Sequence, residues 1–207
     1  MKKVLLIFLI TLFFTSCKNN SETNFDSLKI KDVSEILKTV ILEDSLNVLK
    51  NEKEAKMFCE DLIKLDIYIP EKRKNNNPIP PPLPSFFNVI SLETLLHYKI
   101  ENELFFNSND SLYLLQQNIN PPKLKIEKEV VEKINLTTID KEKNTSKIGK
   151  PYKFYEMTIP IFSSDNEKAY LELNYYCGRL CGVGLSIFLI KINGQWKIIN
   201  KRRTWIS

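Results

Sequence analysis

The chain has 207 residues, of which 43% are hydrophobic and 27% are charged, with a formal net charge of +5. This composition fits one soluble globular domain and excludes an intrinsically disordered chain or a membrane protein with several spans. The 5 glycines disfavour a phosphate-binding loop, and the single histidine excludes a His-rich metal site. We therefore expect neither a metal nor another cofactor.

The first residues have the pattern of a bacterial export signal. Lys2 and Lys3 precede the apolar run 4–14, which is shorter than the roughly 20 residues that span a bilayer and has the size of a signal-peptide core. Residues 14–17, F-T-S-C, resemble the lipobox of bacterial lipoproteins, although Leu is commoner than Phe at its first position. The resemblance implies cleavage before Cys17 and acylation of that cysteine. An ordinary cleaved signal and a buried N-terminal helix are the alternatives.

This resemblance implies a domain organisation and a location. Residues 1–16 form the signal peptide, residues 17–25 a lipidated tether and residues 26–207 a single α+β domain. The N-terminal lipid would hold the mature chain in the bacterial cell envelope, at the outer membrane or facing the periplasm, and the residues do not specify the leaflet. We expect contact with the membrane through this lipid, whereas the weak positive charge gives no reason to expect nucleic acid.

The N-terminal half of the domain contains helix signals and one strand signal. Asp32 and Glu35 have the spacing of a capping box and predict a helix start at Asp32. Residues 52–58 predict a helical turn, the alternation at 65–69 predicts a strand, and residues 109–111 predict the start of another helix. The apolar residues after Asp32 recur at helical spacing and predict one buried face: Val33, Ile36, Leu37, Val40 and Ile41.

A proline-rich run, residues 72–84, interrupts the domain. Basic residues and asparagines precede a cluster of prolines, and such a cluster favours an extended polyproline conformation. Recognition of this run by a peptide-binding partner is one interpretation. We expect a stiff surface connection instead.

The C-terminal part predicts an antiparallel meander of four strands. Asn193-Gly194 is a strong hairpin signal between the last two strands. Pro160 cannot donate a ladder hydrogen bond, so we expect the first strand to be an edge. With the helix at 33–41 packed on one face, the fold class is α+β, with an outline similar to cystatin-like and NTF2-like proteins. The four predicted strands are Phe154–Phe162, Lys168–Cys177, Gly182–Ile192 and Gln195–Trp205.

The turns predict a register for this meander. A two-residue Asn-Gly loop pairs Ile192 with Gln195, and hence Gly182 with Trp205. One face of the sheet then collects apolar residues: Ala169, Leu171, Leu173, Tyr175, Val183, Leu185, Ile187, Leu189, Trp196 and Ile198, joined by Tyr155, Met157, Ile159 and Ile161 of the first strand. The opposite face mixes polar and aromatic residues: Tyr170, Glu172, Asn174, Tyr176, Gly182, Gly184, Ser186, Phe188, Lys197, Lys201, Arg203 and Trp205.

One end of the mixed face is the candidate binding site. Its residues are Tyr176, Arg179, Arg203 and Trp205, because aromatic rings give contact area and arginines bind carboxylate or phosphate, while glycines nearby leave space. We expect a partner protein of the envelope or a small anionic ligand there, and a fully solvated face is the alternative. The string C-G-R-L-C-G at 177–182 and the closing W-I-S resemble a pattern in bacterial lipoproteins that carries no assigned activity, so the resemblance supplies no catalytic residues.

The cysteines favour a structural disulfide. Cys177 and Cys181 flank a short turn, where paired strands are about 5.5 Å apart and suit a disulfide, and the bacterial envelope is an oxidising compartment. Their C-x₃-C spacing differs from the C-x-x-C of thioredoxin-like sites, and a redox role, a metal site and free thiols are the alternatives. Cys59 and His97 have apolar neighbours in the sequence and are predicted to be structural.

No motif for a catalytic nucleophile or for a pair of catalytic carboxylates is legible in the sequence. The sequence therefore favours a lipid-anchored envelope protein that acts as a non-catalytic binding module. The alternative is an envelope enzyme, either a thiol oxidoreductase that uses Cys177 and Cys181 or an enzyme whose site forms only on folding.

Overall fold

The structure, a computed structural model, describes residues 20–43, 46–70, 88–117, 126–147, 153–178 and 180–207. Two units are distinguished, residues 1–32 and residues 33–207, and each is described by itself. The predicted signal peptide, Cys17, the proline-rich run and Arg179 lie outside the described residues. Within the described ranges, no helix combines the length and the apolar character that crossing a membrane requires.

Helix α2 spans Asn20–Glu43 and includes the boundary between the two units. The predicted start at Asp32 is wrong, and residues 20–25, expected as part of a tether, are helical. No glycine or proline occurs within this helix, so nothing in the backbone stops it before Asp32. The predicted apolar face between Val33 and Ile41 is confirmed, since its residues are buried in the second unit.

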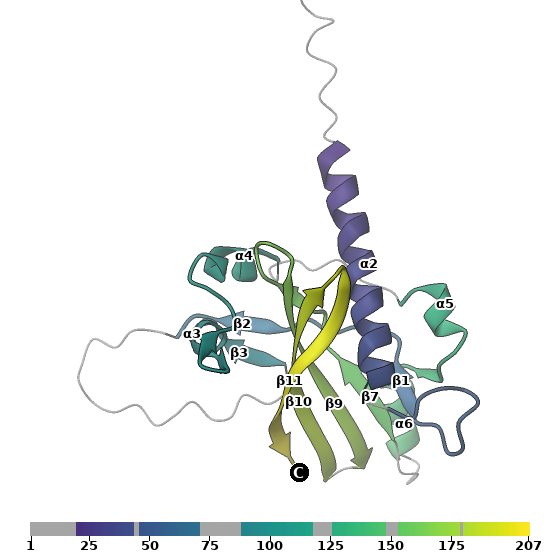
Figure 1. Ribbon diagram of the computed structural model, residues 1–207. Helices are drawn as coiled ribbons and strands as arrows, with labels where there is room; N and C mark the ends of the chain where they lie inside the picture. The colour runs from purple at the N-terminus through teal and green to yellow at the C-terminus, as the bar shows by residue number, and fades with distance from the viewer. Residues whose placement is uncertain (1–19, 44–45, 71–87, 118–125, 148–152, 179) are drawn as a thin grey trace, which may run out of the picture. The chain divides into compact units, whose positions relative to one another are not determined.

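The second unit has the predicted α+β fold, and its described residues form a mixed sheet of 7 strands. The strand order is β11 (Gln195–Ile206), β10 (Cys181–Ile192), β9 (Lys168–Gly178), β7 (Phe154–Met157), β1 (Met57–Cys59) and β6 (Leu136–Thr137), and β8 (Ile161–Phe162) also pairs with β9. The strands from β7 to β11 pair antiparallel, which confirms the meander, whereas β1 pairs parallel with both β6 and β7. Figure 1 shows the long strands β9, β10 and β11 side by side.

Pro160 divides the predicted first strand into β7 and β8. The prediction that this strand is an edge is wrong for β7, because β1 pairs with it on the side away from β9. The proline lies between the two short strands, where the ladder does not need its missing N–H. The interruption also shifts by one residue the alternation of side chains between the two faces of the sheet. Phe162 therefore joins Met157 in the core with α2, whereas Ile161, predicted for that core, lies in the core on the opposite face.

The first hydrophobic core lies between α2 and one face of the sheet. The predicted apolar face is confirmed for most of its residues. Each fully buried aliphatic or aromatic side chain contributes about 1.5–3 kcal/mol. From β9 to β11 the buried members are Ala169, Leu171, Leu173, Ile187, Leu189 and Trp196, with Tyr175, Leu185 and Ile198 packed against them.

A second hydrophobic core covers the opposite face of the sheet, which was predicted to be solvated or to bind a partner. The strand predicted at 65–69 and the helix predicted from 109–111 are confirmed here. The covering elements are β2 (Asp66–Tyr68), β3 (Val89–Ser91), α3 (Leu92–His97), β4 (Lys99–Ile100), β5 (Glu103–Leu104) and α4 (Asp110–Gln117). The buried residues of this core are Leu65, Leu95, Phe105, Phe106, Leu114, Ile161, Tyr170 and Phe188.

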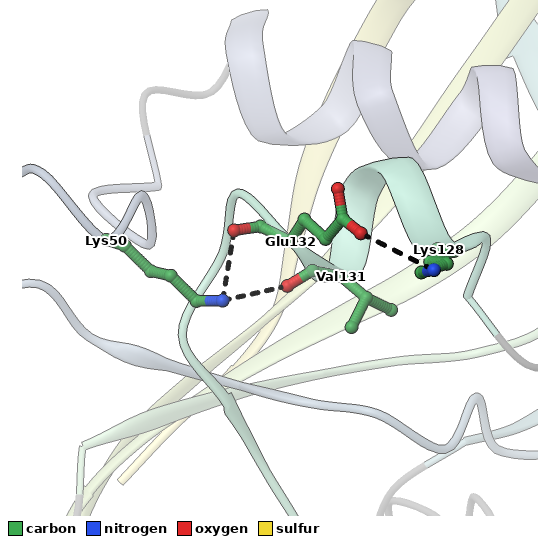
Figure 2. A network of polar contacts seen from close by, with 4 residues as sticks. All are labelled: Lys50, Lys128, Val131 and Glu132. Atoms are coloured by element: carbon green, nitrogen blue, oxygen red, sulfur yellow. Dashed lines mark hydrogen bonds and ion pairs between the residues drawn. The ribbon is translucent and has the colours of Figure 1, made fainter.

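The remaining elements are α5 (Lys128–Val131) and α6 (Ile139–Lys147), on either side of β6 in the sequence. Figure 2 shows that Lys50 Nζ donates to the carbonyl oxygens of Val131, over 3.2 Å, and Glu132, over 3.0 Å. A cation at the last carbonyls of a helix satisfies their hydrogen bonds and complements the helix dipole. Lys50 thus ties its turn to the end of α5. The turns that include residues 52–54 lead into β1, so the helical turn predicted there is wrong.

The predicted Cys177–Cys181 disulfide closes the hairpin between β9 and β10, with Cα atoms 5.0 Å apart. Cys181 pairs with Gly178, because the register shifts next to the turn. Gly178 has φ +150°, a conformation that side chains rarely adopt, which explains the glycine at this position. Cys59 is free and buried in the described structure.

We expect thiol counting to find a single free cysteine outside position 17. A full-length Cys17→Ser chain made in an oxidising compartment and then denatured should take up one alkyl group, on Cys59, without reductant and three after reduction. Intact mass measures the difference directly. Uptake of three groups without reductant would contradict the disulfide.

Candidate functional site

A pocket of about 560 Å³ lies on the second face of the sheet. Strands β9, β10 and β11 form one side, and β2, β3 and α3 form the other. The volume is typical of small-molecule sites, which range over roughly 300–1,000 Å³. This pocket is therefore the candidate functional site.

Two residues with local conformational preferences position β3 and α3, which form one wall of the pocket. Asn88 precedes β3 with φ +64°, a left-handed conformation that asparagine tolerates. Ser91 ends β3 and caps α3, since its hydroxyl accepts a hydrogen bond from the Thr94 backbone N–H over 3.0 Å. The chain therefore passes directly from strand to helix along the pocket.

The sheet face that forms one side of the pocket is ordered in rows that cross three neighbouring strands. Directly paired residues of a sheet share one face. The central row is Glu172, Ser186 and Arg202, and it is flanked by the row Tyr170, Phe188 and Asn200 and by the row Asn174, Gly184 and Trp205. An acid, a hydroxyl and a guanidinium thus follow one another from β9 to the edge strand β11.

Two bulges in the pairing of β10 with β11 create these rows. Ile192 pairs with Gln195, as predicted, next to the turn. The register then shifts twice, and each shift adds one residue to β11. Trp205 consequently lies opposite Gly184, so its predicted pairing with Gly182 is wrong.

Hydrogen bonds hold Glu172 at the base of the pocket. Tyr170 donates its hydroxyl proton to Glu172 Oε1 over 3.0 Å, and Ser186 Oγ lies 2.9 Å from the same hydroxyl. Since Tyr170 has a single hydroxyl proton, Ser186 is the donor in the second bond. The backbone N–H of Asn88 also donates to the Glu172 carboxylate. These bonds link the buried acid to both sides of the pocket.

The charge of Glu172 has no cationic partner in the described part of the chain. Glu172 is 6% exposed and lines the pocket. Burial raises the pKa of its carboxyl group, against the opposing effect of the hydrogen bonds from Tyr170 and Asn88. The ion pairs between described residues include neither Glu172 nor Arg202. Both charges are therefore available to a ligand.

Trp205 fills the space beside the glycines that was predicted to be open to a ligand. Its indole lies against Gly182 and Gly184, where a Cβ on Gly182 would come within 2.7 Å of the ring. The indole Nε1 donates to Asn174 Oδ1 over 3.1 Å, and Asn174 Nδ2 donates to Asn88 Oδ1 over 3.0 Å. The glycines therefore admit a side chain of the protein itself, which lines one part of the pocket.

The predicted binding residues differ in their relation to the pocket. Trp205 lines it, and Tyr176 contacts Trp205 with ring centroids 5.9 Å apart but is not part of the lining. The Tyr176 hydroxyl donates to Glu156 Oε2 over 3.2 Å, and this second buried acid lies outside the lining as well. Arg179 falls outside the described residues.

The bulge nearer the hairpin also exchanges the sheet faces of two neighbouring arginines. Arg203 pairs with Leu185, which packs against the first core, so its register position is on the face away from the pocket. Arg202 pairs with Ser186 and takes the position on the pocket face. Both arginines are exposed and both contribute to the lining. Sequence reasoning missed the role of Arg202, since the bulge that moves it has no sequence signal, and missed the role of Glu172, since the layer that buries it comes from distant segments.

The other chemically suggestive groups lie outside the pocket. Burial raises the pKa of the Cys59 thiol to about 12, which disfavours the reactive thiolate. His97, predicted to be structural, ends α3 and is exposed, with Nδ1 2.9 Å from the Glu93 carbonyl oxygen. Within the described residues, no three His, Cys, Asp or Glu side chains are grouped so as to hold a metal ion.

Comparisons with protein-family models, with curated proteins and with solved structures found no match to this chain. The interpretation of the pocket therefore rests on its own geometry and chemistry.

The raised pKa of Glu172 predicts a pH-dependent stability. The carboxyl group keeps its proton to higher pH in the native state than in the unfolded chain, where its pKa is near 4.5. The contribution of Glu172 to stability therefore falls as the pH rises above 4.5. We expect E172Q to have a higher Tm than the wild type at pH 7, with the difference shrinking toward pH 4.5. Thermal unfolding followed by circular dichroism measures this, and a lower Tm of E172Q at pH 7 would contradict it.

Proposed function

We propose that this protein is a lipid-anchored protein of the bacterial cell envelope that binds a small ligand in the pocket between β9–β11 and β2, β3 and α3. The export signal and the resemblance of residues 14–17 to a lipobox support the anchor. The pocket supports the binding of a small ligand, because a cavity of about 560 Å³ with aromatic walls and a few fixed polar groups is the usual form of a small-molecule site.

The charges at the edge of the pocket favour an anionic group on this ligand. Arg202 and Arg203 are exposed neighbours in β11 and both line the pocket. A guanidinium group binds a carboxylate or a phosphate through two parallel hydrogen bonds. The two arginines thus support the ligand class expected from the sequence, a small anion. Arg202 joins the predicted Arg203 as a residue that would bind it.

The groups in the pocket support binding better than catalysis. Ser186 is hydrogen-bonded to Tyr170, and no histidine belongs to the described lining. A serine nucleophile needs an adjacent base, so hydrolysis by Ser186 has no support. The alternative of a thiol oxidoreductase would use Cys177 and Cys181, which are bridged at a hairpin turn and are not part of the lining.

The anchor can be tested apart from the pocket. We expect the wild-type chain, expressed in a bacterium, to sediment with membranes and to yield an acylated N-terminal peptide that begins at Cys17. The Cys17→Ser chain should not be acylated and should leave the membrane fraction. Mass spectrometry of a wild-type chain with an unmodified cysteine at position 17 would contradict the anchor and leave the pocket proposal standing.

Neutralising the pocket edge should weaken the binding of an organic anion. We expect the double variant Arg202→Ala, Arg203→Ala to bind hexanoate about tenfold or more weakly than the wild type, the usual effect of losing hydrogen bonds to a charged group. Isothermal titration calorimetry measures the affinity, and the Tm should change little because both side chains are exposed.

The matched control is Lys197→Ala, which removes a positive charge from β11 outside the pocket lining. Its hexanoate affinity should stay within about twofold of the wild type, since screening reduces the effect of a distant surface charge. An equal loss in both variants would show a general charge effect and contradict the assignment of the site.

A further inference from the structure

The central row on the pocket side of the sheet holds two opposite charges that are not paired with each other. Glu172 is buried in β9, Arg202 is exposed in β11, and Ser186 lies between them in β10. We propose that the ligand is a small zwitterion whose protonated amine lies against Glu172 and whose carboxylate lies at Arg202. The inference rests on the proposed function and names the class of its ligand.

The environment of Glu172 suits a cation. Its carboxylate accepts hydrogen bonds from Tyr170 and from the Asn88 backbone, and these fix its position. A carboxylate can accept about four hydrogen bonds, so capacity remains for an ammonium group. A buried carboxylate without a counter-ion is unfavourable, and a ligand ammonium would compensate it. A neutral sugar or polyol could donate hydrogen bonds but would leave the charge uncompensated.

Aromatic rings next to the central row add to this preference. Tyr170 and Phe188 lie in the adjacent row of the same sheet face, with ring centroids 5.0 Å apart. Tyr98 stacks on Phe188 at 4.0 Å, lines the pocket and is the one partly exposed ring of the three, so a ligand can contact it. Aromatic rings attract ammonium groups, and the attraction strengthens where water is excluded. The Glu172 carboxylate and the Tyr98 ring therefore both favour a cation in the inner part of the pocket.

The outer part selects the opposite charge. Arg202 occupies the same face at the sheet edge, so a second ammonium group on the ligand would be repelled there and a carboxylate would be bound. Neighbouring strands lie about 4.8 Å apart, so the backbones of Glu172 and Arg202 are separated by about 10 Å. The flexible arginine side chain shortens the span that the ligand must cover. The charges of the ligand are therefore several bonds apart, farther than in an α-amino acid.

The decisive comparison uses probes that differ by one charged group. 6-Aminohexanoate carries both charges, hexanoate lacks the amine, hexylamine lacks the carboxylate, and glycine carries both charges on adjacent groups. We expect wild-type protein to bind 6-aminohexanoate at least about tenfold more tightly than each of the other three, because only this probe reaches both charged side chains. Isothermal titration calorimetry on the full mature chain in detergent measures the four affinities.

Variants then assign the amine to Glu172. E172Q keeps the shape of the side chain and loses its charge, and we expect it to bind 6-aminohexanoate on the order of 30-fold more weakly, as when a buried charge pair loses one partner. Its affinity for hexanoate should not fall. E156Q is the matched control, because Glu156 is the other acid whose pKa burial raises on this sheet, and it lies outside the pocket lining. E156Q should bind both probes as the wild type does.

Dialanine and N-acetyl-dialanine separate the two sources of such a zwitterion, since a peptide and a free ω-amino acid share the same end groups. Preference for dialanine over its acetylated form, or for 6-aminohexanoate over hexanoate, supports the inference, and the tighter binder of dialanine and 6-aminohexanoate identifies the source. Equal binding of hexanoate and 6-aminohexanoate by the wild type overturns the inference while the proposed anion site stands, and this comparison does not depend on any variant folding. Failure of every probe up to about 10 mM overturns both.

Discussion

Strand β9 is buried on both of its faces, and the rest of the structure depends on this constraint. Leu171 and Leu173 pack in the core with α2, whereas Tyr170 packs in the second core beneath β2, β3 and α3. Strands buried on both faces usually consist of apolar residues. Here Glu172 and Asn174 are buried as well, so their polar groups need partners inside the protein.

The second layer supplies those partners. Asn88 donates its backbone N–H to Glu172, accepts a bond from the Asn174 side chain, and receives the Asp66 backbone N–H on its carbonyl oxygen. The same residue thus fastens β2 and β3 to the sheet and shapes the base of the pocket. The charge of Glu172 stays uncompensated in the protein alone. An ammonium group bound next to it would therefore contribute to ligand affinity and stabilise the folded state.

The sequence determined the elements whose signals are local. Asn193-Gly194 specifies the last hairpin, and alternation specifies which residues of β9 and β10 share the first core, because side chains on a strand point to opposite faces in turn. The spacing of Cys177 and Cys181 specifies a bridge across one turn. The apolar stripe of α2 follows from helical periodicity, although the start of that helix does not.

Only the tertiary structure decided what lies on the other face. One bulge in β11 moved Arg202 into the row of Glu172, and the two bulges together put Trp205 opposite Gly184. Each bulge depends on packing that no short window of sequence contains. The short strand β1 pairs parallel with β6 on one side and with β7 on the other, and these pairings join segments that are far apart in the sequence. The sequence by itself thus determined the meander, one core face and the disulfide, while contacts between distant segments decided the second core and the pocket.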